Sequence, residues 1–285
     1  MKKTFLSILI LATATLTAIA QNKSEVSLSF GVGLSSLNYD FEQSGDVKSK
    51  IAPSFAIGYT YKLNTNWGVV SGLEFATYKA EVSSQEVKAQ YAEQDNYNDN
   101  FEWRLSLQGI KEKQKGSYLN IPIMAQFMPG SGDKFYANLG FKIGLPLKGK
   151  YESSYTKLIA KGYYPDIDAE YTDIDFRGFG EFSGNSSKGD IDFKVAFIAS
   201  AEVGMKWRLT NSLNLYTGGY IDYGLNNIVK NYGQIIDYDK NNPIAIIEQN
   251  SLIASNHITG EDTKPFVDKV VPFSLGMKIK LGFSL

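Results

Sequence analysis

The stretch "IDFKVAFIASAEVGMKWRL" (191–209) has an apolar residue at every second position. All ten odd positions, from Ile191 to Leu209, are apolar, while the even positions include Asp192, Glu202 and Arg208. Successive side chains of a β-strand point to opposite faces, so this period of two predicts a strand with one apolar face and one polar face.

Seven other stretches show the same alternation. They span residues 26–35, 51–63, 67–78, 117–127, 135–148, 213–225 and 271–285. Short connections (64–66, 128–134 and 210–212) alternate with long ones (37–50, 81–115, 149–190 and 226–268). This order predicts an all-β fold, an eight-stranded up-and-down antiparallel transmembrane β-barrel with short periplasmic turns and long extracellular loops. We expect the long loops to carry extensions of the strands, because structureless loops of this length are uncommon.

The composition of the two faces distinguishes a membrane barrel from a soluble lipocalin-type barrel, which is apolar inside and polar outside. The polar faces are mostly Gly, Ser and Ala with single charges, which suits a narrow lumen better than a water-facing exterior. Charges inside a lumen need partners. We therefore predict a structural lumen network of Glu74, Lys142, Lys194, Glu202, Lys206, Asp222, Lys278 and Lys280.

Aromatic residues on the apolar faces cluster near the short turns and the last strand. They are Tyr59, Tyr61, Trp67, Phe127, Phe135, Trp207 and Phe283. This clustering predicts an aromatic girdle at the periplasmic interface. The final strand, 271–285, is predicted to pair with the first, near 26–34, because a closed barrel leaves no strand edge unpaired.

The first twenty residues have the pattern of a cleaved export signal. Lys2 and Lys3 precede an apolar stretch that ends in Ala18-Ile19-Ala20, which predicts a signal peptide at 1–20 and a barrel domain at 21–285. The chain has no cysteine, so disulfides and lipoprotein attachment are excluded. Without Lys2 and Lys3, 27 basic residues face 30 acidic ones, a formal charge of −3 that does not favour nucleic acid as a partner.

Three stretches resemble a known group, the small outer-membrane β-barrel proteins of the Bacteroidetes, described as porin-family, PorT-like or OmpA-like barrels. "SYLNIPIMAQF" (117–127) is similar to their Tyr-Leu-x-Ile-Pro strand, and "KGYYPDIDAEYTDIDFRGFGEF" (161–182) resembles a loop of OmpA-like members. Ser274, Gly276, Ile279 and Leu281 match the spacing of the C-terminal signal read by the barrel-assembly machinery. OmpA-like members usually carry a C-terminal peptidoglycan-binding domain, which does not follow here, so no wall-tethering role is expected.

Chemistry-bearing motifs are scarce. His257 is the only histidine, and Ser251 or Ser255 nearby would be needed for a hydrolytic pair. The four long loops contain 24 Asp and Glu against 15 Lys and Arg, and "DNYND" (95–99) and "DIDAEYTDID" (166–175) offer oxygens for Ca²⁺. Neither stretch has the spacing of a calcium loop. We therefore predict no catalytic, cofactor-binding or metal-binding residues, and no enzymatic activity.

The sequence thus predicts an integral protein of the cell outer membrane of a Gram-negative organism, with a structural or surface-interaction role carried by long acidic loops. The alternative is a narrow pore or a PorT-like accessory component of a transport or secretion system. The expected partners are outer-membrane lipid and lipopolysaccharide, the barrel-assembly machinery during insertion, and a surface ligand or secretion-system partner at the loops. Single-channel conductance separates the two roles, because eight strands leave a lumen that side chains nearly fill.

Overall fold

The computed structural model describes residues 24–41, 43, 45–129, 135–230, 232–242, 248–259 and 262–285. The predicted signal peptide lies outside the described residues, as does most of the predicted turn at 128–134. In the described part of the chain, no helix has the length and apolar character needed to cross a membrane.

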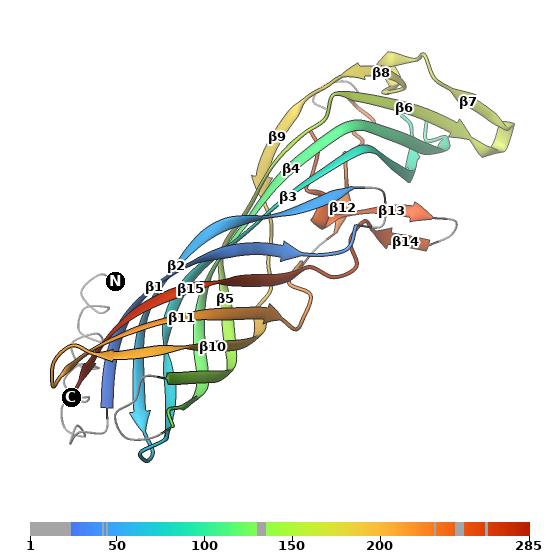
Figure 1. Cartoon of the computed structure of the whole chain (residues 1–285). Coiled ribbons are helices and arrows are strands. Elements are labelled where there is room, and N and C mark those ends of the chain that lie inside the picture. Colours follow the sequence, from blue (N-terminus) through green and yellow to red (C-terminus); the bar gives the residue numbers. More distant parts are fainter. Residues whose placement is uncertain are drawn as a thin grey trace, which may run out of the picture.

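Eight strands pair in sequence into a closed antiparallel ring (Figure 1). Each pairs with the next, and the last pairs with the first, so no strand edge of the ring is left open. The strands are β1 (Ser24–Asn38), β2 (Asp46–Lys62), β3 (Trp67–Gln94), β4 (Asn100–Phe127), β5 (Phe135–Ser154), β10 (Ala196–Arg208), β11 (Leu213–Gly224) and β15 (Val271–Ser284).

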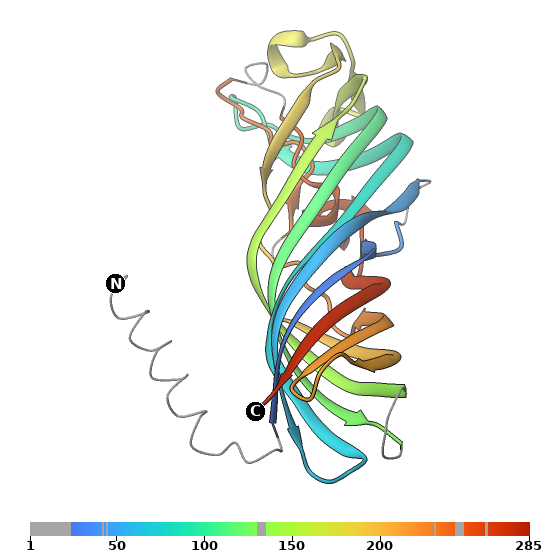
Figure 2. The ribbon, with the colours of Figure 1, turned by 60° about the vertical axis from the view of Figure 1, so that its left-hand side comes forward.

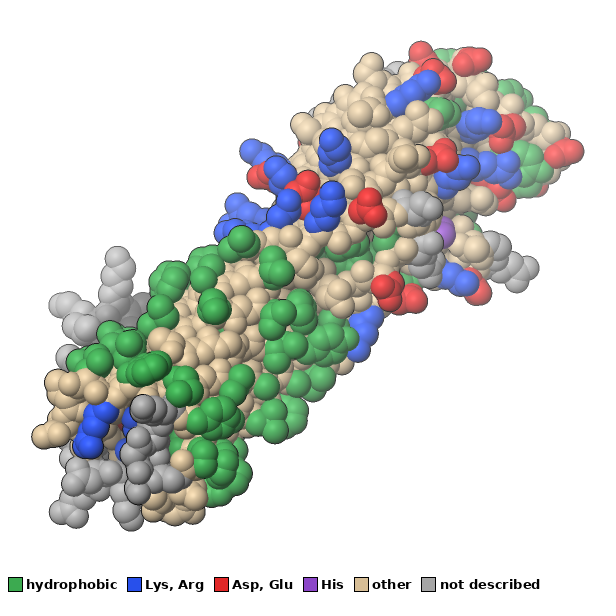
Figure 3. Space-filling view, viewed as in Figure 1, with side chains coloured by type: hydrophobic (Ala, Val, Ile, Leu, Met, Phe, Trp, Pro, Cys, Tyr) green, Lys and Arg blue, Asp and Glu red, His purple; other side chains and the backbone are tan. Residues whose placement is uncertain are grey.

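The outer wall of the ring is apolar and its interior is polar. Large side chains such as Met277, Leu139 and Ile51 are 75%, 70% and 67% exposed, whereas Lys142 is 2% exposed. On the face seen in Figure 3, hydrophobic side chains gather over the half of the molecule that contains the ring, and we call this region the apolar band. A band of this kind is stable only when lipid covers it, which rejects the lipocalin-type alternative.

The chain has more strands than the eight that the sequence predicted. Seven further strands lie beyond the ring, and the two longest strands run far past it (Figure 2). They are β6 (Lys157–Tyr164), β7 (Ala169–Tyr171), β8 (Gly180–Ser183), β9 (Ser186–Asp190), β12 (Gly233–Gln234), β13 (Ser255–Thr259) and β14 (Asp262–Pro265). Three short 3₁₀ helices, η1 (Pro165–Ile167), η2 (Asp175–Arg177) and η3 (Leu252–Ala254), complete this part.

The β3–β4 hairpin supports this second part, which we call the loop domain. Its two strands have 28 residues each and pair from Trp67 and Phe127 to Gln94 and Asn100. A transmembrane strand needs only about 9–11 residues, so more than half of the hairpin projects beyond the apolar band. The predicted loop 81–115 is therefore almost entirely strand. β6 and β9 pair with the projecting ends of β4 and β5.

The loop domain has an aromatic and aliphatic core of its own. Phe101, Trp103 and Phe179 are buried in it together with Leu252 and Ile253 of the last long connection. That connection is also held by hydrogen bonds, because the Tyr91 hydroxyl donates to the Asn256 carbonyl at 2.6 Å and accepts the Ile235 N–H at 2.8 Å. The loop domain is thus a folded body and not a set of separate loops.

The stretch 191–209 differs from its prediction at its beginning. β10 starts only at Ala196, and Ile191 and Phe193 are buried in the core of the loop domain instead of facing lipid. The alternation continues across this boundary because both surroundings, lipid and protein core, favour apolar side chains. Lys194 consequently lies outside the ring and is exposed, so its predicted place in the lumen is wrong.

The predicted closure between the last and first strands is confirmed. β15 pairs with β1 over the whole length of the ring, with Leu28 opposite Leu281. Gly33 and Gly276 face each other at this seam, and a Cβ on Gly33 would lie 2.4 Å from the Leu275 carbonyl oxygen and 2.6 Å from the Gly276 Cα. The seam therefore depends on two strands approaching where neither has a side chain.

We predict that Gly33→Ala weakens the barrel by about 1–3 kcal/mol, the usual cost of overpacking. Gly219→Ala is the matched control, because its Cβ would meet no atom closer than 3.6 Å. The measurement is the urea midpoint of unfolding in detergent micelles, followed by the mobility shift between heated and unheated samples on gels. Equal midpoints for the two variants would contradict the close approach at the seam.

Candidate functional site

The centre of the lumen holds a lysine between two carboxylates. Lys142 of β5 donates from Nζ to Oε1 of Glu74 on β3 at 2.7 Å and to Oδ2 of Asp222 on β11 at 2.8 Å. All three side chains are at least 95% buried. Because β3, β5 and β11 are not neighbours in the ring, these contacts tie together separate parts of the wall across the lumen.

A second group of charges continues this network. Nζ of Lys278 lies 3.1 Å from Glu202 Oε2 and 3.4 Å from Glu74 Oε2, and Nζ of Lys280 lies 3.6 Å from Glu202 Oε1. Glu74 thus bridges the two groups. The ammonium groups of Lys142, Lys278 and Lys280 thus face the carboxylates of Glu74, Glu202 and Asp222, so each of these buried charges has a partner of opposite sign.

Tyrosine side chains fill the space around the charges. Tyr78, Tyr118, Tyr136 and Tyr216 are each at most 1% exposed, and the Tyr136 hydroxyl donates to Glu202 at 2.8 Å. The cavity beside Glu74 has a volume of about 10 Å³. One water needs roughly 10–15 Å³, so this cavity admits at most a single molecule.

Of the eight residues in the predicted lumen network, six form these ion pairs, Lys206 lies on the same lumen face opposite Tyr216, and only Lys194 lies elsewhere. Lys194 is exposed, as described above, and Lys206 is half-buried near the turn end, with Nζ 5.8 Å from the Tyr216 ring centroid. The prediction missed Glu25, which accepts hydrogen bonds from Asn214 and Tyr216, both at 2.9 Å. It also missed the uncharged residues that line the lumen. Their even-numbered positions, on the polar faces of the predicted strands, could have identified them. These residues are Asn120, Tyr136, Tyr216 and Tyr220.

We predict that Lys142→Met destabilises the protein by about 3–5 kcal/mol, because it leaves Glu74 and Asp222 buried without their shared cation. Lys194→Met is the control, since it removes the same charge from an exposed position. Urea unfolding of both variants in the same micelles measures the difference. A Lys142→Met variant as stable as Lys194→Met would contradict the role of the ion pairs.

At the far end of the loop domain, Asp95 holds the tip of the β3–β4 hairpin. Its Oδ1 accepts the N–H groups of Tyr97 at 2.9 Å and Asp99 at 3.0 Å, and its Oδ2 accepts the Tyr164 hydroxyl at 3.0 Å and Arg177 Nη1 at 2.5 Å. Burial by itself raises the pKa of Asp95, but these donors together lower it below its usual range. Asp95 therefore connects the hairpin tip to β6 and η2.

These contacts also involve the two acidic stretches whose oxygens could suit Ca²⁺ but which lack the spacing of a calcium loop. Both oxygens of Asp95 are occupied by protein donors, and Asp168 accepts the Tyr163 hydroxyl at 2.8 Å. Within the described ranges, no group of three or more His, Asp or Glu side chains is arranged to hold a metal ion. The acidic stretches 95–99 and 166–175 thus contribute to turns and contacts inside the loop domain.

The two serines near His257 are engaged elsewhere. The Ser251 hydroxyl donates to Oε1 of Glu112 at 2.7 Å, and the Ser255 hydroxyl donates to the Ser251 carbonyl at 2.7 Å. The His257 ring stacks on Phe266 and its Nδ1 lies 3.3 Å from the Thr259 hydroxyl. The structure therefore assembles neither of the hydrolytic pairs that the sequence offered.

Glu112 of β4 is the anchor for the last long connection. It is fully buried and accepts hydrogen bonds from the Ser251 hydroxyl, the Leu252 N–H at 2.9 Å and the Gln114 amide at 2.8 Å. Burial raises the pKa of Glu112, although these donors offset part of the effect. The carboxylate thus fixes η3 to the base of the loop domain, close to the end of the ring.

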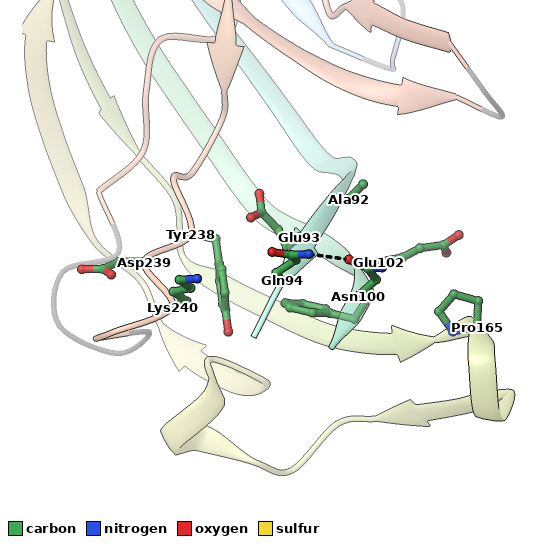
Figure 4. A pocket seen from close by; sticks show the side chains of 10 residues that line it. Ala92, Glu93, Gln94, Asn100, Glu102, Pro165, Tyr238, Asp239 and Lys240 are labelled. Carbon is green, nitrogen blue, oxygen red and sulfur yellow. Dashed lines mark hydrogen bonds between the residues drawn. The ribbon is translucent and has the colours of Figure 1, made fainter. Parts of the chain in front are cut away.

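A pocket of about 720 Å³ opens at the tip of the loop domain (Figure 4). The Tyr238 ring stands opposite the end of the β3–β4 hairpin, where the Gln94 amide donates to Asn100 at 2.9 Å. Glu93, Glu102, Asp239 and Lys240 also line the pocket. Its lining combines an aromatic face with carboxylates and amides, and it is net negative.

We predict that Asp95→Asn loosens the tip by about 1–3 kcal/mol, the usual range for lost charge-assisted hydrogen bonds. Asp99→Asn is the control, because Asp99 contributes its backbone N–H and its side chain is exposed. The readout is hydrogen exchange of residues 95–103 at neutral pH. Equal protection in both variants would contradict the role of Asp95.

The Asp95 contacts also predict a pH dependence. Because the folded-state pKa is lowered, this stabilisation is present above the unfolded pKa of about 3.9 and is lost as the pH falls through the folded value. Strong acidification should therefore reduce the hydrogen-exchange protection of the tip more in the wild type than in the Asp95→Asn variant. The comparison is made after correction for the pH dependence of intrinsic exchange. An equal loss in both would show that another group governs the acid response.

The closed ring, its apolar exterior and its paired lumen charges define an integral β-barrel of the outer-membrane type. Residues 19–230 match the family model described as outer membrane protein beta-barrel domain, and the chain belongs to that family. It is accordingly an outer-membrane protein. No curated protein matches the chain.

Several solved structures of outer-membrane proteins are similar to this chain at low sequence identity and low TM-score. Ail of Yersinia pestis is 11% identical, with 92% of this chain and 99% of that chain covered and a TM-score of 0.32. OprG of Pseudomonas aeruginosa is 12% identical, with 92% and 97% covered and a TM-score of 0.31. The protease OmpT of Escherichia coli is 9% identical, with the same coverage and a TM-score of 0.32. A fold shared at this level assigns no activity.

Proposed function

We propose that this protein is a closed outer-membrane anchor that displays the loop domain at the cell surface for interaction with another molecule. The observation that carries the proposal is the contrast between the two parts of the chain. Paired charges and tyrosines occupy the lumen, and the cavity beside Glu74 has a volume of only about 10 Å³. The loop domain, in contrast, is a folded body with its own core and pocket.

The proposed orientation places the loop domain outside and the short turns in the periplasm. Two observations support it. The aromatic residues expected at the periplasmic interface lie at the turn end of the ring, where the rings of Trp67 and Phe127 are 4.8 Å apart. The turn end also carries the C-terminus, beside the first strand (Figure 1).

The tip pocket is the proposed recognition site. Its aromatic face and its acceptors, Tyr238, Glu93 and Glu102, suit a polar ligand that presents hydroxyl or amine donors. Burial and the nearby Asp237 raise the pKa of Glu93, while the Gln234 amide, which donates to Glu93, lowers it. The connection 226–268 and the hairpin tip each supply one wall, so both must be folded for the pocket to exist.

We predict that a cysteine at the tip reacts with a membrane-impermeant maleimide on intact cells, and that a cysteine in a short turn does not. The natural chain has no cysteine, so each label reports one position. Phe176→Cys tests the loop domain, where Phe176 is 69% exposed, and Thr65→Cys tests the exposed turn after β2.

Thr65→Cys should be labelled only after the cells are lysed, which also controls for its reactivity. Labelling of Thr65→Cys on intact cells, with Phe176→Cys protected, would reverse the orientation and overturn the proposed function.

A further inference from the structure

A groove lined by lysines lies on the outer surface of β2–β5, between the apolar band and the loop domain. It has a volume of about 650 Å³. In the space-filling view, Lys and Arg side chains gather directly above the apolar band (Figure 3). The lysines that line the groove are Lys50, Lys79, Lys113, Lys115 and Lys150, and we call them the lysine collar.

Three members of the lysine collar form a row across adjacent strands. Lys79 of β3 is directly opposite Lys115 of β4, which is directly opposite Lys150 of β5. Like charges in directly opposed positions of a sheet are destabilising. Among the residues that the structure describes, none of these three has a carboxylate within ion-pair distance of 4.0 Å, whereas Lys50 pairs with Glu81 at 2.5 Å.

The next row toward the loop domain differs from this one. There Glu81 and Glu152, two residues along their strands from Lys79 and Lys150, lie opposite Lys113 on either side, so negative and positive charges alternate. The row of Lys79, Lys115 and Lys150 is therefore a local concentration of positive charge on a chain whose formal net charge is −1.

The position of the groove indicates what neutralises this charge. Its lower edge is Ile51, which is 67% exposed and belongs to the apolar band, directly next to Lys50. On β5, Lys148 likewise follows Leu147, which is 56% exposed. A molecule in the groove thus meets Ile51 on the membrane side and the row of ammonium groups next to it, while Glu81 and Glu152 line the side toward the loop domain.

The geometry points to a binding site for the phosphorylated headgroup of an outer-leaflet glycolipid of the lipid A type. The phosphates lie against Lys79, Lys115 and Lys150, and the acyl chains lie along the apolar band beside Ile51. Charge-assisted hydrogen bonds from lysine to phosphate offset the repulsion within the row. This inference rests on the proposed orientation, in which the loop end of the ring faces the outer leaflet.

Native mass spectrometry of the detergent-solubilised protein tests the site directly, with three probes: diphosphoryl lipid A, the same lipid without phosphates, and inorganic phosphate. The wild type should retain diphosphoryl lipid A at least tenfold better than the dephosphorylated lipid. K79Q/K115Q/K150Q should lose at least tenfold in that preference, since one charge-assisted hydrogen bond is worth about one power of ten or more. K157Q/K161Q/K264Q, with the same change of charge in the loop domain, should behave as wild type.

The single variant K115Q adds a test that does not depend on the triple variant folding. Without lipid it should be at least as stable to heat as wild type, because it removes repulsion from the centre of the row. With diphosphoryl lipid A it should gain less stability than wild type does.

Three results would overturn the site: equal retention of phosphorylated and dephosphorylated lipid, competition by inorganic phosphate at the same concentration, or unchanged binding by both collar variants. Because the protein is in detergent, these results are independent of the cell-labelling experiment. A failure of the proposed orientation can therefore be distinguished from a failure of the site.

Discussion

The structure depends on one constraint: within a lipid layer, every backbone edge and every inward charge must find its partner in the same chain. The pairing of β15 with β1 satisfies the backbone, and Lys142 between Glu74 and Asp222 satisfies the centre of the lumen. Both solutions bring together segments that are far apart in the sequence. The same contacts that stabilise the ring also occupy its lumen.

A closed ring gives the long strands a fixed base. β3 and β4 leave the apolar band as a paired hairpin, and the remaining connections attach to it through Glu112, Tyr91 and Asp95. These three residues hold η3, the segment near Asn256 and the tip near Arg177 at successive levels of the hairpin. The loop domain is consequently held in one position relative to the membrane, which is what a surface interaction from a rigid scaffold requires.

The alternation in the sequence was sufficient to predict the ring, its inside and outside, and the seam between its last and first strands. It could not show where a strand leaves lipid for a protein core, since both environments accept Ile191 and Phe193. For this reason Lys194 was assigned to the lumen. The strands of the loop domain were missed as separate elements because each is short and depends on the hairpin as its template.

The charges show the same limit of sequence reasoning. Counted together, the four long connections are acidic. This count does not show that their basic and acidic residues lie in different parts of the structure. Lysines such as Lys115 and Lys150 collect next to the apolar band, while carboxylates such as Asp95, Asp168 and Asp239 lie at or near the tip. Only the register of β3, β4 and β5 reveals that Lys79, Lys115 and Lys150 are neighbours.

We propose that the ring is an anchor closed by its own side chains. Single-channel recording of the purified protein in planar bilayers tests whether the lumen conducts. We expect no steady conductance steps across the accessible voltage range. Reproducible, long-lived openings of uniform size would contradict it and would favour a transport role for the barrel.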